Sequence, residues 1–212
     1  MSNRSIDAVL FDFAGVMTTS PFEASGAIGA AAGVAPELVL ELMLGPYHED
    51  TDHPWHRLER GEIPLSEYGL AVAAEARAAG LDLDFASLRT LFGDLAIRDD
   101  VVGRVTELRA DGYATALITN NVREAAGQWR RMLALDDLFD VVVDSSAVGM
   151  RKPDPRIYLH ALALLDGVAP DRAVFLDDAP GKVEGARRAG LHAIHVEDPV
   201  VALAELDVLL GG

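Results

Sequence analysis

Four short polar segments each follow a short apolar run, and their side chains are suited to binding a cation and an anion together. Asp12 follows the first run, Thr119 the second, Lys152 lies beyond the third, and the pair Asp177 and Asp178 ends the fourth. Carboxylates gathered at one place resist ionisation, and a hard cation such as Mg2+, which prefers oxygen ligands, relieves that crowding. With an ammonium and a hydroxyl beside the cation, such a site suits a phosphate group.

The apolar runs indicate the elements that must position these groups. They are continuous rather than alternating, as in strands buried on both faces, and cover residues 8–11, 114–118, 141–143, 173–176 and 193–196. Helical patterns lie between or after them, at residues 101–110, 123–135, 155–165 and 183–189. This alternation predicts the α/β class, as a Rossmann-like, doubly wound parallel sheet with right-handed crossovers. The polar segments should then meet where the strands end.

The segment between the first two runs is longer than a crossover needs. It has helical patterns at residues 36–44, 65–79 and 85–92. We therefore predict an α/β core domain of residues 1–18 and 97–212 and an inserted α-helical cap domain of residues 19–96. Open α/β sheets bind ligands beyond the carboxyl ends of their strands, where this insert leaves the core, so we expect the cap to cover the site.

Composition excludes several classes of function. The 212 residues contain 18 Lys and Arg against 34 Asp and Glu, for a net charge of -16. Such an acidic protein repels nucleic acids and anionic membranes, so we expect neither as a partner. The absence of Cys excludes disulfides, thiolate metal sites and a Cys nucleophile. With no apolar run of membrane-spanning length and no signal-like start, we expect a cytoplasmic protein, either a monomer or a homodimer.

In this order, the four polar segments resemble those of the haloacid dehalogenase-like (HAD) hydrolase superfamily, and the helical insert resembles its subfamily I caps. Two stretches are similar to the branch that contains the phosphatase domain of soluble epoxide hydrolases and bacterial sugar-phosphate phosphatases. They are Phe11-Asp12-Phe13-Ala14-Gly15-Val16 and Trp55-His56-Arg57-Leu58-Glu59-Arg60-Gly61-Glu62-Ile63. The resemblance implies a Mg2+-dependent phosphatase that hydrolyses a small phosphorylated metabolite through an aspartyl-phosphate intermediate.

The resemblance also implies roles for individual residues. Asp12 would be the nucleophile, and the Mg2+ ligands would be Asp12, the backbone carbonyl of Ala14 and Asp177, with Asp178 as a ligand or a holder of a water molecule. Thr119 would hydrogen-bond the transferred phosphoryl group, and Lys152 would neutralise charge on the nucleophile and the phosphate. Asn120 follows Thr119 closely enough to contact a bound substrate.

The chain departs from the usual family pattern at Ala14, where an aspartate commonly protonates the leaving group and then activates water. Such proton transfer is worth about 10²–10⁴ in rate. Slow turnover, a substitute acid or the loss of hydrolysis would each account for the change. His56 in the cap is the candidate substitute, since histidine titrates near neutral pH. The alternative is that His56 lies on an exposed loop without contacts.

A second departure is Lys182, because the family usually has Asn at this position. Lys182 is a candidate to contact a substrate anion or to pair with Asp178, and the alternative is a solvated lysine at the start of a helix.

Two other functions compete with a phosphatase. A 2-haloacid dehalogenase uses the same nucleophile and also lacks an aspartate at the position of Ala14, but it needs no metal, and the pair Asp177 and Asp178 would repel its anionic substrate. A catalytically impaired descendant would bind a phosphorylated ligand or a protein partner without turnover.

Overall fold

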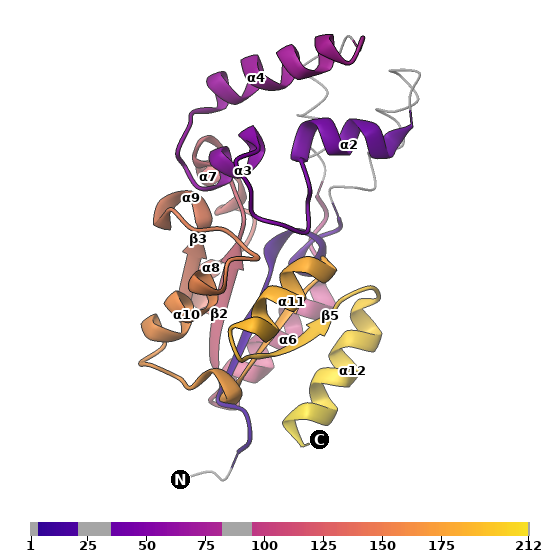
Figure 1. The fold of residues 1–212 in the computed structure, drawn as a ribbon. Coiled ribbons are helices and arrows are strands. Elements are labelled where there is room, and N and C mark those ends of the chain that lie inside the picture. Colours follow the sequence, from indigo (N-terminus) through magenta and orange to yellow (C-terminus); the bar gives the residue numbers. More distant parts are fainter. Residues whose placement is uncertain (1–3, 21–34, 82–94, 212) are drawn as a thin grey trace.

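The computed structural model describes residues 4–20, 35–81 and 95–211. Its centre is a five-stranded, all-parallel sheet with the order β3-β2-β1-β4-β5 (Figure 1). The strands are β1 (Ala8–Phe11), β2 (Ala114–Thr119), β3 (Val141–Asp144), β4 (Ala173–Asp177) and β5 (His192–His195). The Rossmann-like α/β architecture expected from the sequence is therefore confirmed, with β1 as the central strand.

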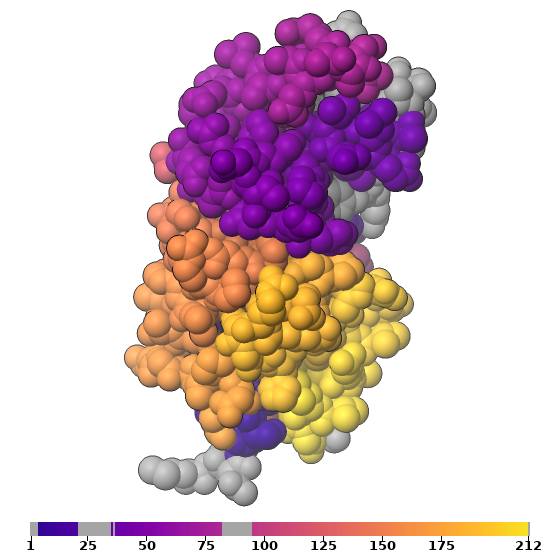
Figure 2. Space-filling model, in the orientation of Figure 1, coloured from indigo at the N-terminus to yellow at the C-terminus, as the bar shows by residue number. Residues whose placement is uncertain are grey.

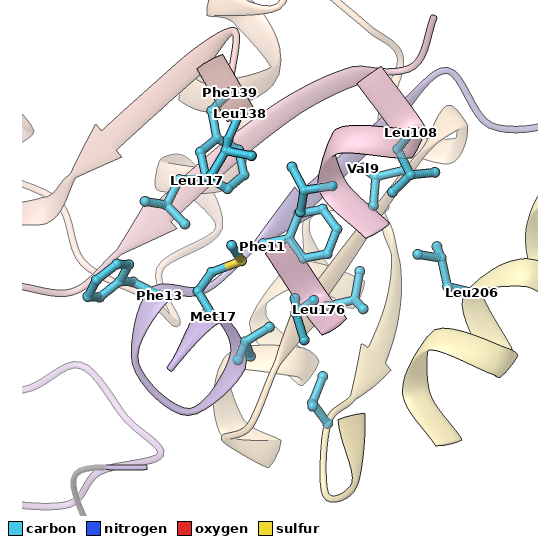
Figure 3. Packing of buried hydrophobic residues seen from close by; sticks show 14 of the residues in the cluster. Val9, Phe11, Phe13, Met17, Leu108, Leu117, Leu138, Phe139, Leu176 and Leu206 are labelled. Atoms are coloured by element: carbon cyan, nitrogen blue, oxygen red, sulfur yellow. The ribbon is translucent and has the colours of Figure 1, made fainter. Parts of the chain in front are cut away.

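Both faces of the sheet are buried, which explains the continuous apolar runs. On one face Val9, Phe11 and Leu176 pack against α6 (Asp99–Ala110) and α12 (Pro199–Leu210), as Figure 3 shows for part of this cluster. On the other face Leu10 and Phe175 pack against α10 (Pro155–Leu164) and α11 (Pro180–Arg188). Successive residues of a strand point to opposite faces, so every residue of β1 enters one core or the other.

Three helices form a separate layer over the carboxyl ends of the strands (Figure 1). They are α2 (Pro36–Leu44), α3 (Pro54–Glu59) and α4 (Leu65–Ala78), and residues 35–81 are called the cap below. The cap has its own apolar cluster, in which Trp55 packs edge-on against Tyr68 and the Tyr68 hydroxyl donates a hydrogen bond to the carbonyl of Met43 (2.7 Å). On the face shown in Figure 2 the cap abuts the core. The division into domains at residues 18 and 97 stays a prediction.

The helices agree with the sequence patterns except in one stretch. Residues 123–135 do not form one helix but three short pieces: η3 (Arg123–Ala125), α7 (Ala126–Trp129) and, after a turn, α8 (Leu135–Leu138). Trp129 and Leu135 both enter the same core cluster. Six residues apart on one helix, they would point about 120° apart, so a break is needed to bury both.

Other differences are smaller. The last strand begins and ends one residue earlier than expected, and the short helices α3 and α9 (Ser145–Val148) and the terminal α12 had no predicted counterpart. The helix expected at residues 85–92 lies outside the described residues. Among the residues that the structure describes, no helix is long and apolar enough to cross a membrane.

Candidate active site

Asp12 lies at the end of the central strand β1, at the carboxyl edge of the sheet. Its backbone N–H donates to the carbonyl of Leu176 (2.9 Å), and its carboxylate Oδ1 accepts from the N–H of Phe13 (2.6 Å). Strands β2 and β4 flank β1, so their last residues, Thr119 and Asp177, end on either side of Asp12. All three of these side chains are buried. The sheet therefore brings three of the predicted site residues to one edge.

Asp12, Asp177 and Asp178 form a compact carboxylate cluster. One oxygen from each lies within 4.8 Å of the others. Gly15, in the helical turn η1 (Phe13–Met17), makes room for Asp178: a Cβ on this residue would lie 2.0 Å from Asp178 Oδ2. Asp178 Oδ1 is buried and accepts no hydrogen bond from any described residue. An orphaned oxygen within a carboxylate cluster fits a hard divalent cation as a ligand set.

Lys152 bridges two members of this cluster. Its Nζ lies 2.7 Å from Asp12 Oδ1 and 2.7 Å from Asp177 Oδ2, and its side chain is fully buried. Asn120 holds the backbone of Lys152 on both sides, because the Lys152 N–H donates to Asn120 Oδ1 (2.8 Å) and Asn120 Nδ2 donates to the Lys152 carbonyl (2.9 Å). Asn120 is thus placed to orient Lys152.

Lys182 also faces the cluster, from the first turn of α11. Its Nζ lies 3.4 Å from Asp12 Oδ2 and 3.9 Å from Asp177 Oδ1, and it donates a hydrogen bond to the hydroxyl of Tyr47 (2.8 Å). The residue is only 4% exposed. The alternative of a solvated lysine is therefore wrong: α11 begins against the sheet edge and points this side chain inward.

The charges of the cluster are coupled. Burial opposes the ionisation of Asp12, but the ammonium groups of Lys152 and Lys182 outweigh it and lower its pKa to about 2. Burial and the neighbouring charge of Asp12 raise the pKa of Asp177 to about 7. Burial likewise raises the pKa of Asp178. Asp12 is therefore ionised at neutral pH, as a nucleophile must be.

Ala14 lies in η1, two residues after Asp12, and its methyl side chain offers neither an acid nor a base. Its backbone departs from helical values (φ -78°, ψ 126°) within the turn. The structure therefore agrees with the sequence that the side chain at position 14 supplies no proton.

His56 is neither on an exposed loop nor without contacts. It is fully buried in α3, where its Nδ1 accepts a hydrogen bond from the N–H of Thr51 (3.0 Å). Burial, followed by the positive charge of Arg151, lowers the pKa of His56 to about 3. The ring is neutral at physiological pH and packs inside the cap, so the sequence-based hypothesis of a titrating acid finds no support in its surroundings.

Two further residues at the site had no assigned role. Arg151 is fully buried beside Lys152 and donates from Nε to Glu59 Oε2 of α3 (2.7 Å) and from Nη1 to the carbonyl of Glu49 (2.6 Å). The feature of the sequence that could have indicated Arg151 as a site residue is its position next to Lys152. Tyr47 reaches Lys182 from the cap, and no sequence pattern marks it.

The family description "haloacid dehalogenase-like hydrolase" matches residues 6–190. Acyl-CoA dehydrogenase family member 10 of Mus musculus is 33% identical over 98% of this chain and 19% of its own length. Bifunctional epoxide hydrolase 2 of Mus musculus is 30% identical over 81% of this chain and 33% of its own length. The chain thus spans a fifth to a third of these relatives. Phosphatase MT3486 of Mycobacterium tuberculosis is 34% identical over 70% of this chain and 72% of its own length.

A solved structure gives the same result for the fold. The predicted HAD-like family hydrolase from Porphyromonas gingivalis superposes with a TM-score of 0.68 at 26% identity, covering 95% of this chain and 98% of that one. The matched region contains β1 through α11, and with them all three carboxylates and both lysines. This chain belongs to the haloacid dehalogenase-like hydrolases.

Proposed function

We propose that this hydrolase is a Mg2+-dependent phosphatase that cleaves a small phosphomonoester with Asp12 as the nucleophile. The observation that carries the proposal is the bridging position of Lys152, 2.7 Å from both Asp12 and Asp177, at the edge of a three-carboxylate cluster. The similarity to a protein named as a phosphatase over 70% of the chain supports it.

The chemistry begins with the ionised carboxylate of Asp12. One of its oxygens forms a bond to phosphorus while the bond from phosphorus to the ester oxygen breaks, leaving an aspartyl-phosphate and an alkoxide. Lys152 neutralises charge on the nucleophile and the transferred group, and the Thr119 hydroxyl donates to a phosphoryl oxygen. Water then attacks the phosphorus, loses a proton to solvent and releases inorganic phosphate, which restores the carboxylate.

The orphaned Oδ1 of Asp178 supports a metal site among the carboxylates. Asp12, Asp177 and Asp178 would hold Mg2+ together with the backbone carbonyl of Ala14. Such an ion would supply positive charge that offsets the negative charge of the carboxylates and of the phosphoryl group. The leaving alkoxide takes its proton from solvent, because the methyl group of Ala14 has none to give.

The test is a panel of small phosphomonoesters assayed for phosphate release, with Mg2+ and with EDTA. We expect release in Mg2+ and none in EDTA or with Asp12→Asn. Asp144→Asn is the matched control, because Asp144 also ends a strand but caps α9, through the N–H of Ser146 (3.0 Å). We expect it to retain wild-type activity.

Phosphate release by Asp12→Asn at the wild-type rate would reject the nucleophile. Chloride release from a 2-chloro acid in the presence of EDTA would favour the dehalogenase instead. Tight binding of Mg2+ and phosphate without turnover on the whole panel would favour a binding protein.

A further inference from the structure

Two ammonium groups share the same two carboxylates. The Nζ of Lys152 lies 2.7 Å from Asp12 Oδ1 and 2.7 Å from Asp177 Oδ2. Lys182 faces the other oxygen of each pair, Asp12 Oδ2 at 3.4 Å and Asp177 Oδ1 at 3.9 Å. Each lysine therefore faces a different oxygen of each carboxylate: Lys182 faces the oxygens of Asp12 and Asp177 that Lys152 does not contact.

The cap holds Lys182 in this position. The Tyr47 hydroxyl accepts its hydrogen bond at 2.8 Å, and the ammonium lies 4.6 Å from the centre of the Tyr47 ring. Gly181 allows the cap backbone to come this close, because a Cβ there would lie 2.6 Å from the Cα and the carbonyl oxygen of His48. A buried lysine with these partners has little freedom to leave.

A divalent cation in this cluster needs the oxygens that Lys182 faces. Lys152 and the N–H of Phe13 already occupy Asp12 Oδ1, so Asp12 Oδ2 is the oxygen left for a metal. With all three carboxylates ionised, as ligation of a metal requires, the two ammonium groups leave the cluster a net charge of -1, whereas without Lys182 it would carry -2.

We propose that Lys182 is a resident counter-ion of the carboxylate cluster, which holds the cluster together without metal and weakens the binding of Mg2+. The inference rests on the metal site of the proposed function. The repulsion between two positive charges grows as they approach one another and doubles when one of them is a divalent ion. Even a fraction of this repulsion lowers the affinity by about tenfold or more.

The experiment measures Mg2+ binding to the metal-free protein by isothermal titration calorimetry at constant ionic strength. We expect Lys182→Asn and Lys182→Met to bind Mg2+ at least about tenfold more tightly than the wild type. Arg187→Met, which removes an exposed positive charge from the same helix α11, is the matched control and should leave the affinity unchanged.

A second readout follows the lysine signals of the wild type during Mg2+ titration, since Lys152 and Lys182 are the two lysines of the chain. Protein labelled with 13C at lysine Cε should give two signals, and the one lost in Lys182→Asn belongs to Lys182. We expect Mg2+ to shift this signal, because an ion bound among the carboxylates changes the charge around the ammonium.

The outcomes separate the two proposals. Equal Mg2+ affinity in the wild type and both Lys182 variants, or a Lys182 signal unmoved at Mg2+ saturation, would overturn the counter-ion and leave the metal site standing. If neither the wild type nor the variants bind Mg2+ at millimolar concentration, the metal site and the counter-ion both fail.

Discussion

At the scale of single residues, Ala14 separates the positioning of Asp12, the proposed nucleophile, from the supply of a proton. Its place in η1 keeps the turn that orients Asp12 and Gly15, yet the methyl group cannot protonate a leaving group. A phosphatase of this kind is handicapped only when the leaving group is strongly basic, because a stable leaving group departs without help.

We therefore expect Ala14→Asp to raise kcat for alkyl phosphates by about tenfold or more, with little change for p-nitrophenyl phosphate. Steady-state phosphate release on both substrates measures the difference. The control is Ala14→Asn, because Asn has nearly the same shape as Asp but no acidic proton. This variant should raise neither rate. A fall in kcat with Ala14→Asp on the alkyl substrate would mean that another group already supplies the proton.

At the scale of elements, α3 packs an uncharged imidazole inside the cap. His56 accepts from Thr51 and has a pKa of about 3, because burial and then the charge of Arg151 disfavour its protonated form. In the unfolded chain the same group has a pKa near its usual 6.5. Between these values the unfolded state binds more protons, so this residue lowers stability as the pH falls.

The expected result is that His56→Asn flattens the dependence of stability on pH. Wild-type protein should lose up to about 1.4 kcal/mol per pH unit from this residue below pH 6.5, while the variant, whose amide oxygen can still accept from Thr51, should not. Urea unfolding from pH 8 to pH 5 measures the two slopes. Parallel slopes would show that His56 takes up its proton in the folded protein as readily as in the unfolded chain, so that its pKa is not lowered.

At the scale of the whole molecule, a buried ion pair joins the cap to the core. Arg151 is fully buried, with Nε 2.7 Å from Glu59 of α3 and Nη1 3.4 Å from Asp50. Asn120, which orients Lys152, also lies 3.5 Å from Glu59. The contact that fastens the cap therefore adjoins the residues that position Lys152.

Glu59→Ala removes one carboxylate and leaves Asp50 as the carboxylate that pairs with the buried Arg151 charge among the described residues. We expect a loss of about 3 kcal/mol in the free energy of unfolding, measured from the urea midpoint at an unchanged slope. Glu107→Ala, which removes a partner of Arg104 on the surface, should cost less than about 1 kcal/mol. If the two variants lost equal stability, the buried pair would have no special part in fastening the cap.

Much of this arrangement was predictable because strands buried on both faces have a distinctive pattern. Asp12, Thr119 and Asp177 follow or end predicted parallel strands, so they were expected to lie together at one edge of the sheet. The order of the polar segments indicated the family. The burial of His56 and the contact of Tyr47 with Lys182 depend on how the cap packs on the core, which no local pattern records. The break in the helix after Trp129 also depends on tertiary packing, because burying both Trp129 and Leu135 in the core outweighs the local helix propensity.

The central position of β1 has a consequence for biosynthesis. β1 precedes the other strands of this sheet in the chain yet lies in the middle of the sheet, and one neighbour, β4, ends only at Asp177. Lys182 and Asp12 are 170 positions apart in the chain. Until the intervening residues have been synthesised, the four apolar residues of β1 lack β4 as a pairing partner, and they can aggregate or pair with the wrong segment. A nascent chain halted before β4 should therefore depend on chaperones and lack the assembled carboxylate cluster.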